Sequence, residues 1–295
     1  MTLTGVFAAL PTPFGDDDQL DVRRLRAAVS WWVASPLTGF VLLGSTGEAV
    51  LMDDDECDRA VDEARSLVPR QRPFVVGVGR ESTRATIRAA RRAADFGADS
   101  VLVRTPGFFK SQMTGDAFTR YYTAVADASP VPVLLYNFTA LTGVNLLPAT
   151  VAHLARHENI IGMKESGGDI SQIADLVAST PDAFSVLAGS GSSFFPALCA
   201  GASGGILALA ALLPEPCVRL FELTRNKQYD AARELQQRLI PIARLSSTYS
   251  VPGLKAPLNL VGCDVGRPRP PLVPVSETTA TALKEALARF EEVRA

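Results

Sequence analysis

The chain has 295 residues, of which 47% are hydrophobic and 20% are charged, and its formal net charge is −2. This composition is typical of a globular protein with a large core. The balanced charge excludes the basic surface that nucleic acid or an anionic membrane would require, and no apolar run approaches the ~18 residues of a membrane-spanning helix. The start of the chain lacks the basic segment of a signal peptide, and the four cysteines are widely spaced. We therefore expect a soluble cytoplasmic protein with reduced thiols.

Short apolar runs alternate with segments of helical periodicity along the chain. The strand-like runs lie at 6–10, 39–43, 74–78, 100–103, 131–135, 160–164, 184–187 and 205–209. Helical segments lie between them at 20–33, 53–67, 82–96, 116–128, 148–156, 170–179 and 193–200. Nearly continuous apolar strands separated by helices are typical of a parallel sheet that is covered on both faces. Eight such units predict a (β/α)8 TIM barrel over residues 1–225.

Residues 226–295 predict a helical extension of the same domain. Segments 228–245 and 278–294 are amphipathic, and the Pro-rich connector 267–271 lies between them. A doubly wound nucleotide-binding sheet is the alternative to the barrel. However, Gly77-Val78-Gly79 lacks the third glycine of the dinucleotide fingerprint, and no P-loop motif occurs.

Catalytic groups of such barrels lie at the C-terminal ends of the strands, so the polar residues there are site candidates. They are Thr12, Ser45, Thr46, Glu48, Tyr136, Asn137, Lys164, Glu165, Ser190 and Ser192. Of the five lysines, only Lys164 ends a fully apolar strand-like run. Burial disfavours a charged ammonium and so favours an amine that attacks a carbonyl carbon, although the lysine head could instead reach past the strand end to water. Together, a lysine, a tyrosine and several hydroxyls favour imine chemistry.

The sequence contains no recognisable set of metal ligands. Its two histidines, His153 and His157, lie four residues apart on the predicted fifth helix, away from the strand ends, which favours an exposed helix over a metal site. Without another histidine, a serine or cysteine nucleophile has no suitable base. We therefore expect no metal and no cofactor other than a covalent imine between Lys164 and the substrate.

Taken in order, the motifs resemble those of the pyruvate-dependent class I aldolases, the family of dihydrodipicolinate synthase and N-acetylneuraminate lyase. The resemblance covers nearly the whole chain. It rests on Gly44-Ser45-Thr46-Gly47-Glu48, Tyr136-Asn137, Gly162-Met163-Lys164-Glu165, Gly189 and the Gly204-Gly205-Ile206 run. Each piece alone is common, but together they follow the strand ends in the order of the family.

The resemblance implies a role for each of these residues. Lys164 would form a Schiff base with the 2-oxo group of pyruvate or another 2-oxo acid. Tyr136, hydrogen-bonded to Ser45, would transfer protons, while Ser45 and Thr46 with their backbone N–H groups would bind the pyruvyl carboxylate. Further expected substrate contacts are Gly44, Gly47, Leu141, Gly189, Ser190 and the backbone carbonyl of Ile206.

The sequence departs from the synthase at two places. Leu141 stands where the synthase has an arginine that binds the carboxylate of its aldehyde substrate, and Phe108 and Phe109 occupy the loop where it has an inter-subunit tyrosine. The segments 164–169 and 187–190 look more like those of 4-hydroxy-2-oxoglutarate and 2-keto-3-deoxy sugar-acid aldolases. We therefore predict an aldolase that cleaves a 4-hydroxy-2-oxo acid to pyruvate and an aldehyde.

Several alternatives remain open at this point. The chain could be a 4-hydroxy-tetrahydrodipicolinate synthase or an N-acetylneuraminate lyase, or a 2-keto-3-deoxy acid dehydratase on the same scaffold. A non-catalytic binding barrel is disfavoured, because binding alone needs no amine beside a phenol. The family commonly forms dimers or tetramers, so a homodimer or homotetramer is expected. The physiological direction and the aldehyde are not determined by the sequence.

Overall fold

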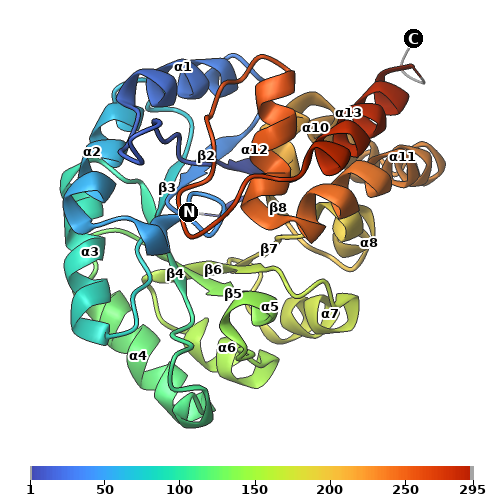
Figure 1. Ribbon diagram of the computed structural model, residues 1–295. Helices are drawn as coiled ribbons and strands as arrows, with labels where there is room; N and C mark the ends of the chain where they lie inside the picture. Colours follow the sequence, from blue (N-terminus) through green and yellow to red (C-terminus); the bar gives the residue numbers. More distant parts are fainter. Residues whose placement is uncertain (1, 293–295) are drawn as a thin grey trace.

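The computed structural model describes residues 2–292, in which eight parallel strands close into a barrel in the order β1 to β8, as Figure 1 shows. The strands are β1 (Gly5–Ala9), β2 (Gly39–Leu42), β3 (Phe74–Gly77), β4 (Ser100–Arg104), β5 (Val133–Asn137), β6 (Ile160–Glu165), β7 (Ser185–Ala188) and β8 (Gly204–Leu207). Strand β8 pairs with β1 and thereby closes the sheet. The predicted (β/α)8 TIM barrel is confirmed.

Helices surround the barrel and connect its strands. The longer ones are α1 (Val22–Val33), α2 (Asp54–Arg65), α3 (Thr83–Asp95), α4 (Gly115–Ala128), α6 (Pro148–Leu154), α7 (Ile170–Ser179), α8 (Phe194–Cys199) and α10 (Pro214–Arg225). Short helical pieces occupy the loops: α5 (Thr139–Thr142), α9 (Leu209–Leu212), and the 3-10 turns η1 (Ala49–Leu51), η2 (Lys110–Gln112) and η3 (Gly191–Ser193). Most of the short pieces lie at the carboxyl ends of strands, where a barrel builds its site.

Local sequence signals set the starts of several helices. Helix α2 begins with a capping box, in which the Asp53 side chain accepts from the Glu56 N–H and the Glu56 carboxylate accepts from the Asp53 N–H. Ser82 caps α3, and Asp169 caps α7. Each cap satisfies backbone donors that have no partner within the helix and contributes about 1 kcal/mol.

Side chains that point into the barrel form a small apolar cluster of their own. The cluster comprises Leu3, Phe7, Ala9, Val41, Val75, Leu102, Leu134, Tyr136, Leu187 and Ile206. The alternate residues of the strands point outward and join the larger core beneath the helices. The interior is therefore filled by side chains, and a substrate has access only at an end of the barrel.

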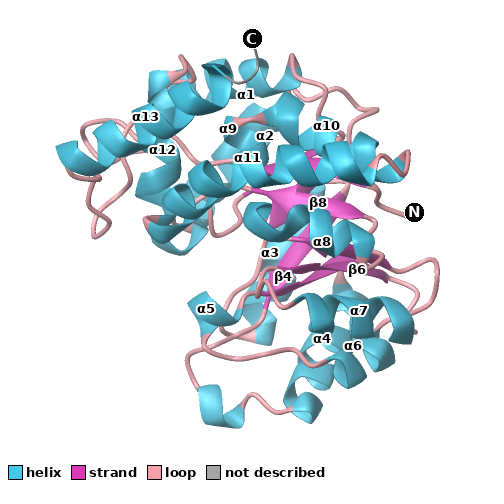
Figure 2. Cartoon of the chain, turned by 90° about the vertical axis from the view of Figure 1, so that its right-hand side faces the viewer, coloured by secondary structure: helices cyan, strands magenta, loops and turns pink. Residues whose placement is uncertain are grey.

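Three helices follow the barrel: α11 (Tyr229–Thr248), α12 (Ser250–Leu260) and α13 (Glu277–Glu292). Figures 1 and 2 show them on the side of α8 and α10, and α12 also contacts α9. The predicted helix at 228–245 is confirmed, as is the one at 278–294 up to residue 292, beyond which the prediction lies outside the described residues. Helix α12 belongs to the predicted helical extension, but its bounds were not predicted, because Pro252, Gly253 and Pro257 interrupt the helical pattern of that segment. Helix α10 ends at Arg225, and the proposed boundary after it stays a prediction.

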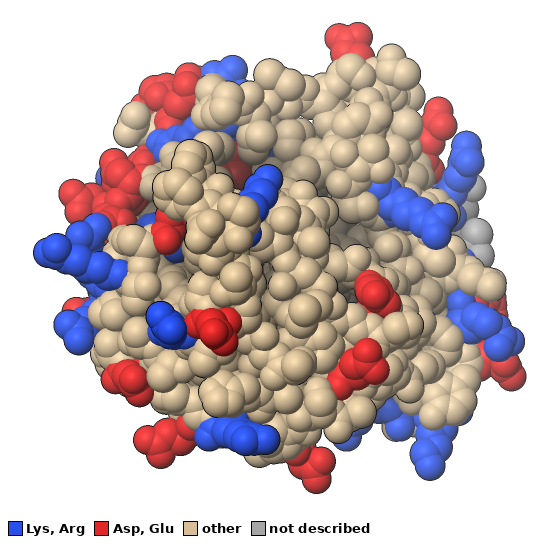
Figure 3. Space-filling model, turned by 90° about the horizontal axis from the view of Figure 1, so that it is seen from below, with Lys and Arg blue, Asp and Glu red and all other residues tan. Residues whose placement is uncertain are grey.

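The surface carries charges of both signs. On the face shown in Figure 3, basic and acidic side chains are interspersed, and the described residues there form no continuous basic patch. Within residues 2–292, no helix is both long and apolar enough to span a membrane. The cysteines are free thiols, and burial raises the pKa of Cys57 to about 11, which disfavours a reactive thiolate.

Candidate active site

Lys164 and Tyr136 lie side by side at the carboxyl end of the barrel because they are paired across β6 and β5. Directly paired residues of two parallel strands point to the same face of the sheet. The Lys164 Nζ is 4.5 Å from the centre of the Tyr136 ring, and the two residues are 5% and 3% exposed. The Tyr136 hydroxyl lies 3.1 Å from Ser45 Oγ. An amine, a phenol and a hydroxyl are thus brought together from β6, β5 and the turn after β2.

Two lysines are buried within residues 2–292, and their surroundings differ. Lys255 is 1% exposed, but its Nζ lies 2.6 Å from the Glu48 carboxylate and donates to the Arg267 carbonyl at 3.0 Å. Lys164 forms no ion pair with any described residue, and it lines a cavity. An amine without a carboxylate partner is available to a carbonyl substrate. Lys164 is therefore the candidate nucleophile.

The turn after β2, residues 44–48, places backbone donors near this amine. Leu43 and Glu48, at its two ends, adopt left-handed conformations with φ of 57° and 56°. Such conformations cost a non-glycine residue on the order of 1 kcal/mol and are often found at functional sites. Within residues 2–292, the N–H groups of Ser45 and Thr46 donate no hydrogen bond. Two free N–H groups and two hydroxyls in one turn can bind a carboxylate.

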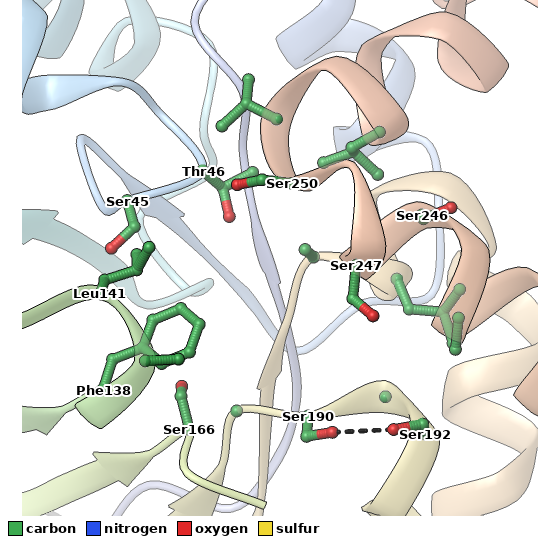
Figure 4. A pocket seen from close by; sticks show the side chains of 18 of the residues that line it. Ser45, Thr46, Phe138, Leu141, Ser166, Ser190, Ser192, Ser246, Ser247 and Ser250 are labelled. Carbon is green, nitrogen blue, oxygen red and sulfur yellow. Dashed lines mark hydrogen bonds between the residues drawn. The ribbon is translucent and has the colours of Figure 1, made fainter. Parts of the chain in front are cut away.

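A cavity of about 360 Å³ opens beside Lys164. Figure 4 shows Ser45 on one side of it and Ser247, from α11, on the other, with Thr46 and Ser250 between them in this view. Its lining comprises Ser45, Thr46, Tyr136, Phe138, Ala140, Leu141, Lys164, Ser166, Gly189, Ser190, Gly191, Ser192, Ala208, Leu209, Ala243, Ser246, Ser247, Ser250, Val251 and Leu254. Lys164 is the one charged side chain in this lining, and seven of the others are serines. The cavity therefore suits a ligand with several hydrogen-bonding groups.

The loops after β6 and β7 contribute hydroxyl groups to the floor of the cavity. Ser190 Oγ and Ser192 Oγ are 3.1 Å apart, as Figure 4 shows. Ser166 Oγ is buried and has no hydrogen-bond partner among the described residues. A Cβ atom at Gly189 would lie 1.8 Å from this oxygen, so only glycine leaves room for it. A buried hydroxyl without a protein partner is available to a ligand.

Asn137 and Glu165, which were among the strand-end candidates, do not line the cavity. They follow Tyr136 and Lys164 directly and are paired with each other, so their side chains point to the outer face of the sheet. Asn137 Nδ2 donates to Glu165 Oε2 at 2.7 Å, and Gln172 Nε2 on α7 donates to the same oxygen at 2.9 Å. Burial raises the pKa of Glu165, and these hydrogen bonds oppose the shift. The pair joins the barrel to α7.

Other expected residues support the turn or fill the barrel. The Thr12 hydroxyl donates to the Gly47 carbonyl at 2.6 Å, and Glu48 is paired with Lys255. Gly44 borders a cavity of about 30 Å³, which Ser45 and Tyr136 also line, and Ile206 is fully buried in the interior cluster. Gly44, Gly47 and Ile206 do not line the larger cavity, and their contacts with substrate stay predictions.

The two histidines lie on the outer side of the barrel. The prediction that both belong to one helix is wrong, because α6 ends at Leu154 and His157 follows it. His157 Nε2 lies 3.0 Å from Asp127 Oδ1 on α4. No group of three His, Cys, Asp or Glu side chains that could hold a metal ion occurs among the described residues.

Sequence reasoning missed one wall of the cavity. These residues, Ser246, Ser247, Ser250, Val251 and Leu254, come from α11 and α12, some eighty to ninety residues after Lys164 in the chain. The only sequence signal is the concentration of hydroxyls in the segment 246–250, where the amphipathic pattern ends. This signal does not reveal that the segment faces the ends of the strands.

Comparison with known proteins agrees with this geometry. The chain matches the Dihydrodipicolinate synthetase family over residues 2–290. It belongs to that family. A 4-hydroxy-tetrahydrodipicolinate synthase from Exiguobacterium sp. is 37% identical over 292 residues, which cover 99% of this chain and 99% of the relative.

Solved structures of family members have the same fold. The dihydrodipicolinate synthase of Thermotoga maritima is similar with a TM-score of 0.93 and 31% identity, covering 99% of each chain. A prophage protein of the dihydrodipicolinic acid synthase family from E. coli K12, in complex with pyruvate, is similar with a TM-score of 0.93 and 30% identity, also covering 99% of each chain. The family is the group of pyruvate-dependent class I aldolases, as the motifs indicated. The names of the curated relatives favour the synthase over the cleavage of a 4-hydroxy-2-oxo acid.

Proposed function

We propose that this protein is a Schiff-base lyase that cleaves a 4-hydroxy-2-oxo acid to pyruvate and an aldehyde. The observation that carries the proposal is Lys164, a buried amine without an ion-pair partner among residues 2–292, in a cavity whose other lining residues are uncharged. The amine supplies the imine, and the hydroxyl-rich lining supplies hydrogen bonds to the rest of the substrate.

In this mechanism, Lys164 Nζ attacks C2 of the substrate to give a carbinolamine. Tyr136 protonates its hydroxyl, which departs as water and leaves an iminium that joins Nζ to C2. The Tyr136 oxygen then takes the proton of the C4 hydroxyl. The C3–C4 bond breaks, the aldehyde forms, and the bonding electrons move into the iminium to give an enamine. Tyr136 returns the proton to C3, and hydrolysis of the imine releases pyruvate. The iminium is the electron sink, so the steps need no other cofactor.

The two ends of the substrate meet different groups. The carboxylate next to C2 binds the free N–H groups and hydroxyls of Ser45 and Thr46. The part beyond C4 extends toward Ser190, Ser192 and Ser247. Hydroxyls both donate and accept hydrogen bonds, so this end suits a hydroxylated aldehyde.

A second candidate function is that of 4-hydroxy-tetrahydrodipicolinate synthase, which the names of the curated relatives favour. The lining of the cavity argues against it. Leu141 is 57% exposed at the cavity, and Lys164 is the one cationic residue of the lining. A carboxylate-bearing aldehyde would therefore lack a bidentate partner among the described residues of the lining.

We also propose that the protein is a homodimer or homotetramer. Phe108 and Phe109 are 78% and 68% exposed on the loop after β4, and Thr105 Oγ1 donates to Thr142 Oγ1 next to the exposed Leu141. Exposed apolar side chains gathered in adjoining loops are typical of a surface that another chain covers. The particle mass from light scattering tests this assignment, and a monomer would contradict it.

Borohydride trapping tests the function directly. Wild-type protein incubated with pyruvate and borohydride is expected to carry a reduced pyruvyl adduct on the peptide that contains Lys164. Lys164→Ala should show no adduct and should lose at least ~10³-fold in turnover, because no other group replaces the covalent step. Lys110→Ala, at an exposed lysine, serves as the control and should be trapped like wild type.

The trapped enzyme then distinguishes the two candidate reactions. Release of pyruvate from 2-keto-3-deoxy sugar acids, whose aldehyde half is hydroxylated and uncharged, supports the lyase. Condensation of pyruvate with the carboxylate-bearing aldehyde of the synthase, without such release, supports the second candidate. A dehydrated product without an aldehyde would instead indicate a dehydratase. The absence of an adduct under conditions that trap a known aldolase would refute imine chemistry.

A further inference from the structure

A buried ion pair connects the turn after β2 to helix α12. The Glu48 carboxylate lies 2.6 Å from Lys255 Nζ, and each side chain is 1% exposed. The Arg269 N–H donates to Glu48 Oε2 at 2.8 Å, and Lys255 Nζ donates to the Arg267 carbonyl at 3.0 Å. The Phe14 ring lies 4.7 Å from the Lys255 ammonium. The connection therefore reaches from the turn to α12 and to the segment that follows it.

The energetics of this pair indicate a purpose other than stability. Burial raises the pKa of Glu48 and lowers that of Lys255, because both charges leave water. Replacing a buried ion pair by apolar residues of similar size is often neutral or even stabilising. Glu48 also adopts the left-handed conformation, which is unfavourable for a residue with a side chain. Glu48 thus combines a buried charge with an unfavourable backbone conformation, which suggests that its position serves the candidate active site.

The pair lies next to two parts of the cavity lining, the turn after β2 and helix α12. Glu48 follows Thr46 by two residues, and its N–H donates to the Ser45 carbonyl at 3.2 Å, so its position fixes that of the turn. Lys255 follows Leu254, a residue of the cavity lining on α12. Neither charged group lines the cavity itself. A change in their contact would therefore move the carboxylate-binding turn relative to α12.

We propose that Glu48 and Lys255 are a positioning pair, which holds the Ser45–Thr46 turn at the distance from Lys164 that carboxylate binding requires. This inference rests on the proposed function, because it concerns the affinity for pyruvate. The pair touches no substrate and takes no part in proton transfer. It acts on the geometry of the two free N–H groups, and through them on the concentration at which pyruvate saturates the enzyme.

The test uses the full chain with Glu48→Gln, Lys255→Met and the double variant. Glutamine keeps an oxygen for the Arg269 N–H, and methionine keeps the length of the lysine stem. The readouts are the pyruvate concentration for half-maximal borohydride trapping, the trapping rate at saturation and the thermal midpoint. Each single variant should raise the half-saturating concentration by about tenfold to a hundredfold, as expected for lost charge-assisted contacts. The rate at saturation should stay within about threefold, because Lys164 and Tyr136 are unchanged.

The double variant separates positioning from stability. Removing both charges leaves no unpaired buried ion, so the thermal midpoint should recover relative to the single variants. The half-saturating pyruvate concentration should nevertheless stay raised. Recovery of both the thermal midpoint and the half-saturating concentration would show that the pair is purely structural and would overturn the inference. Single variants that fold and bind pyruvate like wild type would also overturn it. If a single variant fails to fold, the double variant still decides between these outcomes.

An ion pair between a buried arginine and a half-buried aspartate at the opposite end of the barrel provides the control. Arg65, at the end of α2, is 6% exposed and lies 3.1 Å from Asp99, which also accepts the N–H of Phe74 at the start of β3. Arg65→Met should lower the thermal midpoint without changing the half-saturating pyruvate concentration. If wild type is not trapped by pyruvate, the proposed function fails. If wild type is trapped and the Glu48 and Lys255 variants bind pyruvate normally, only the positioning role fails.

Discussion

The wall of the cavity around Lys164 is built from strand ends, whereas the opposite wall is built from helices α11 and α12. Lys164 and Tyr136 are held by a register of backbone hydrogen bonds between β5 and β6. Ser247 and Ser250 depend on the packing of α11 and α12 against the rest of the chain. A barrel thus fixes its reacting groups through the sheet and presents the remainder of the substrate to elements that can differ between relatives.

The two walls also differ chemically. The strand wall combines the one charged residue of the lining with a phenol, and both are almost fully buried. The helix wall offers neutral hydroxyls and apolar side chains. We therefore expect changes in the strand wall to lower the rate of the chemical steps, and changes in the helix wall to alter the affinity for particular substrates.

Removal of the phenol should have the largest of these effects. Tyr136→Phe keeps the ring next to Lys164 but removes the group that hydrogen-bonds Ser45 at 3.1 Å. Turnover should fall by about 10²- to 10⁴-fold, the usual contribution of a positioned acid or base. Steady-state kinetics with pyruvate-releasing substrates measure the effect, and borohydride trapping shows whether the imine still forms. A turnover near that of wild type would assign the proton transfer to another group.

Changes in the helix wall should be smaller and should depend on the substrate. Ser247→Ala removes one hydroxyl of α11 from the lining, so the KM for a hydroxylated 2-oxo acid should rise about three- to tenfold, as expected for one hydrogen bond. Trapping with pyruvate, which does not extend beyond C3, should be unaffected. Ser30→Ala, at an exposed serine of α1, is the matched control. If KM is unchanged for every substrate tested, this wall does not contact the substrate.

The same difference explains how much could be predicted from the sequence. The apolar strands and the residues directly after them are local signals, so the barrel and the candidates Lys164, Tyr136 and Ser45 could be identified. The directions of the side chains could not be predicted. Asn137 and Glu165 also follow apolar runs, and only the register of β5 and β6 places their side chains on the outer face of the barrel. The burial of Lys255 could not be predicted, because it depends on Glu48, some two hundred residues away, and on a helix interrupted by proline.

Glu165 offers the smallest but most specific test of the outward-facing side of the sheet. Its side chain is 1% exposed and accepts from Asn137 and Gln172 on one oxygen and from the Gly167 N–H on the other. Burial raises its pKa above the ordinary value of 4.5. Between these two pKa values, the folded chain retains a proton that the unfolded chain has released. The contribution of Glu165 to the free energy of unfolding therefore falls as the pH rises through this window.

Glu165→Gln should remove this contribution. The amide oxygen can still accept from Asn137 and Gln172, but its nitrogen cannot accept the Gly167 N–H, so the variant should lose about 1 kcal/mol at pH 4. As the pH rises, the buried Glu165 of the wild type becomes charged, which lowers the free energy of unfolding of the wild type. The glutamine of the variant stays neutral, so the difference between the two free energies of unfolding should shrink. Denaturant titrations at several pH values measure this trend. A difference that is independent of pH would mean that Glu165 does not titrate in this range. Turnover should change little, because this side chain lies outside the cavity.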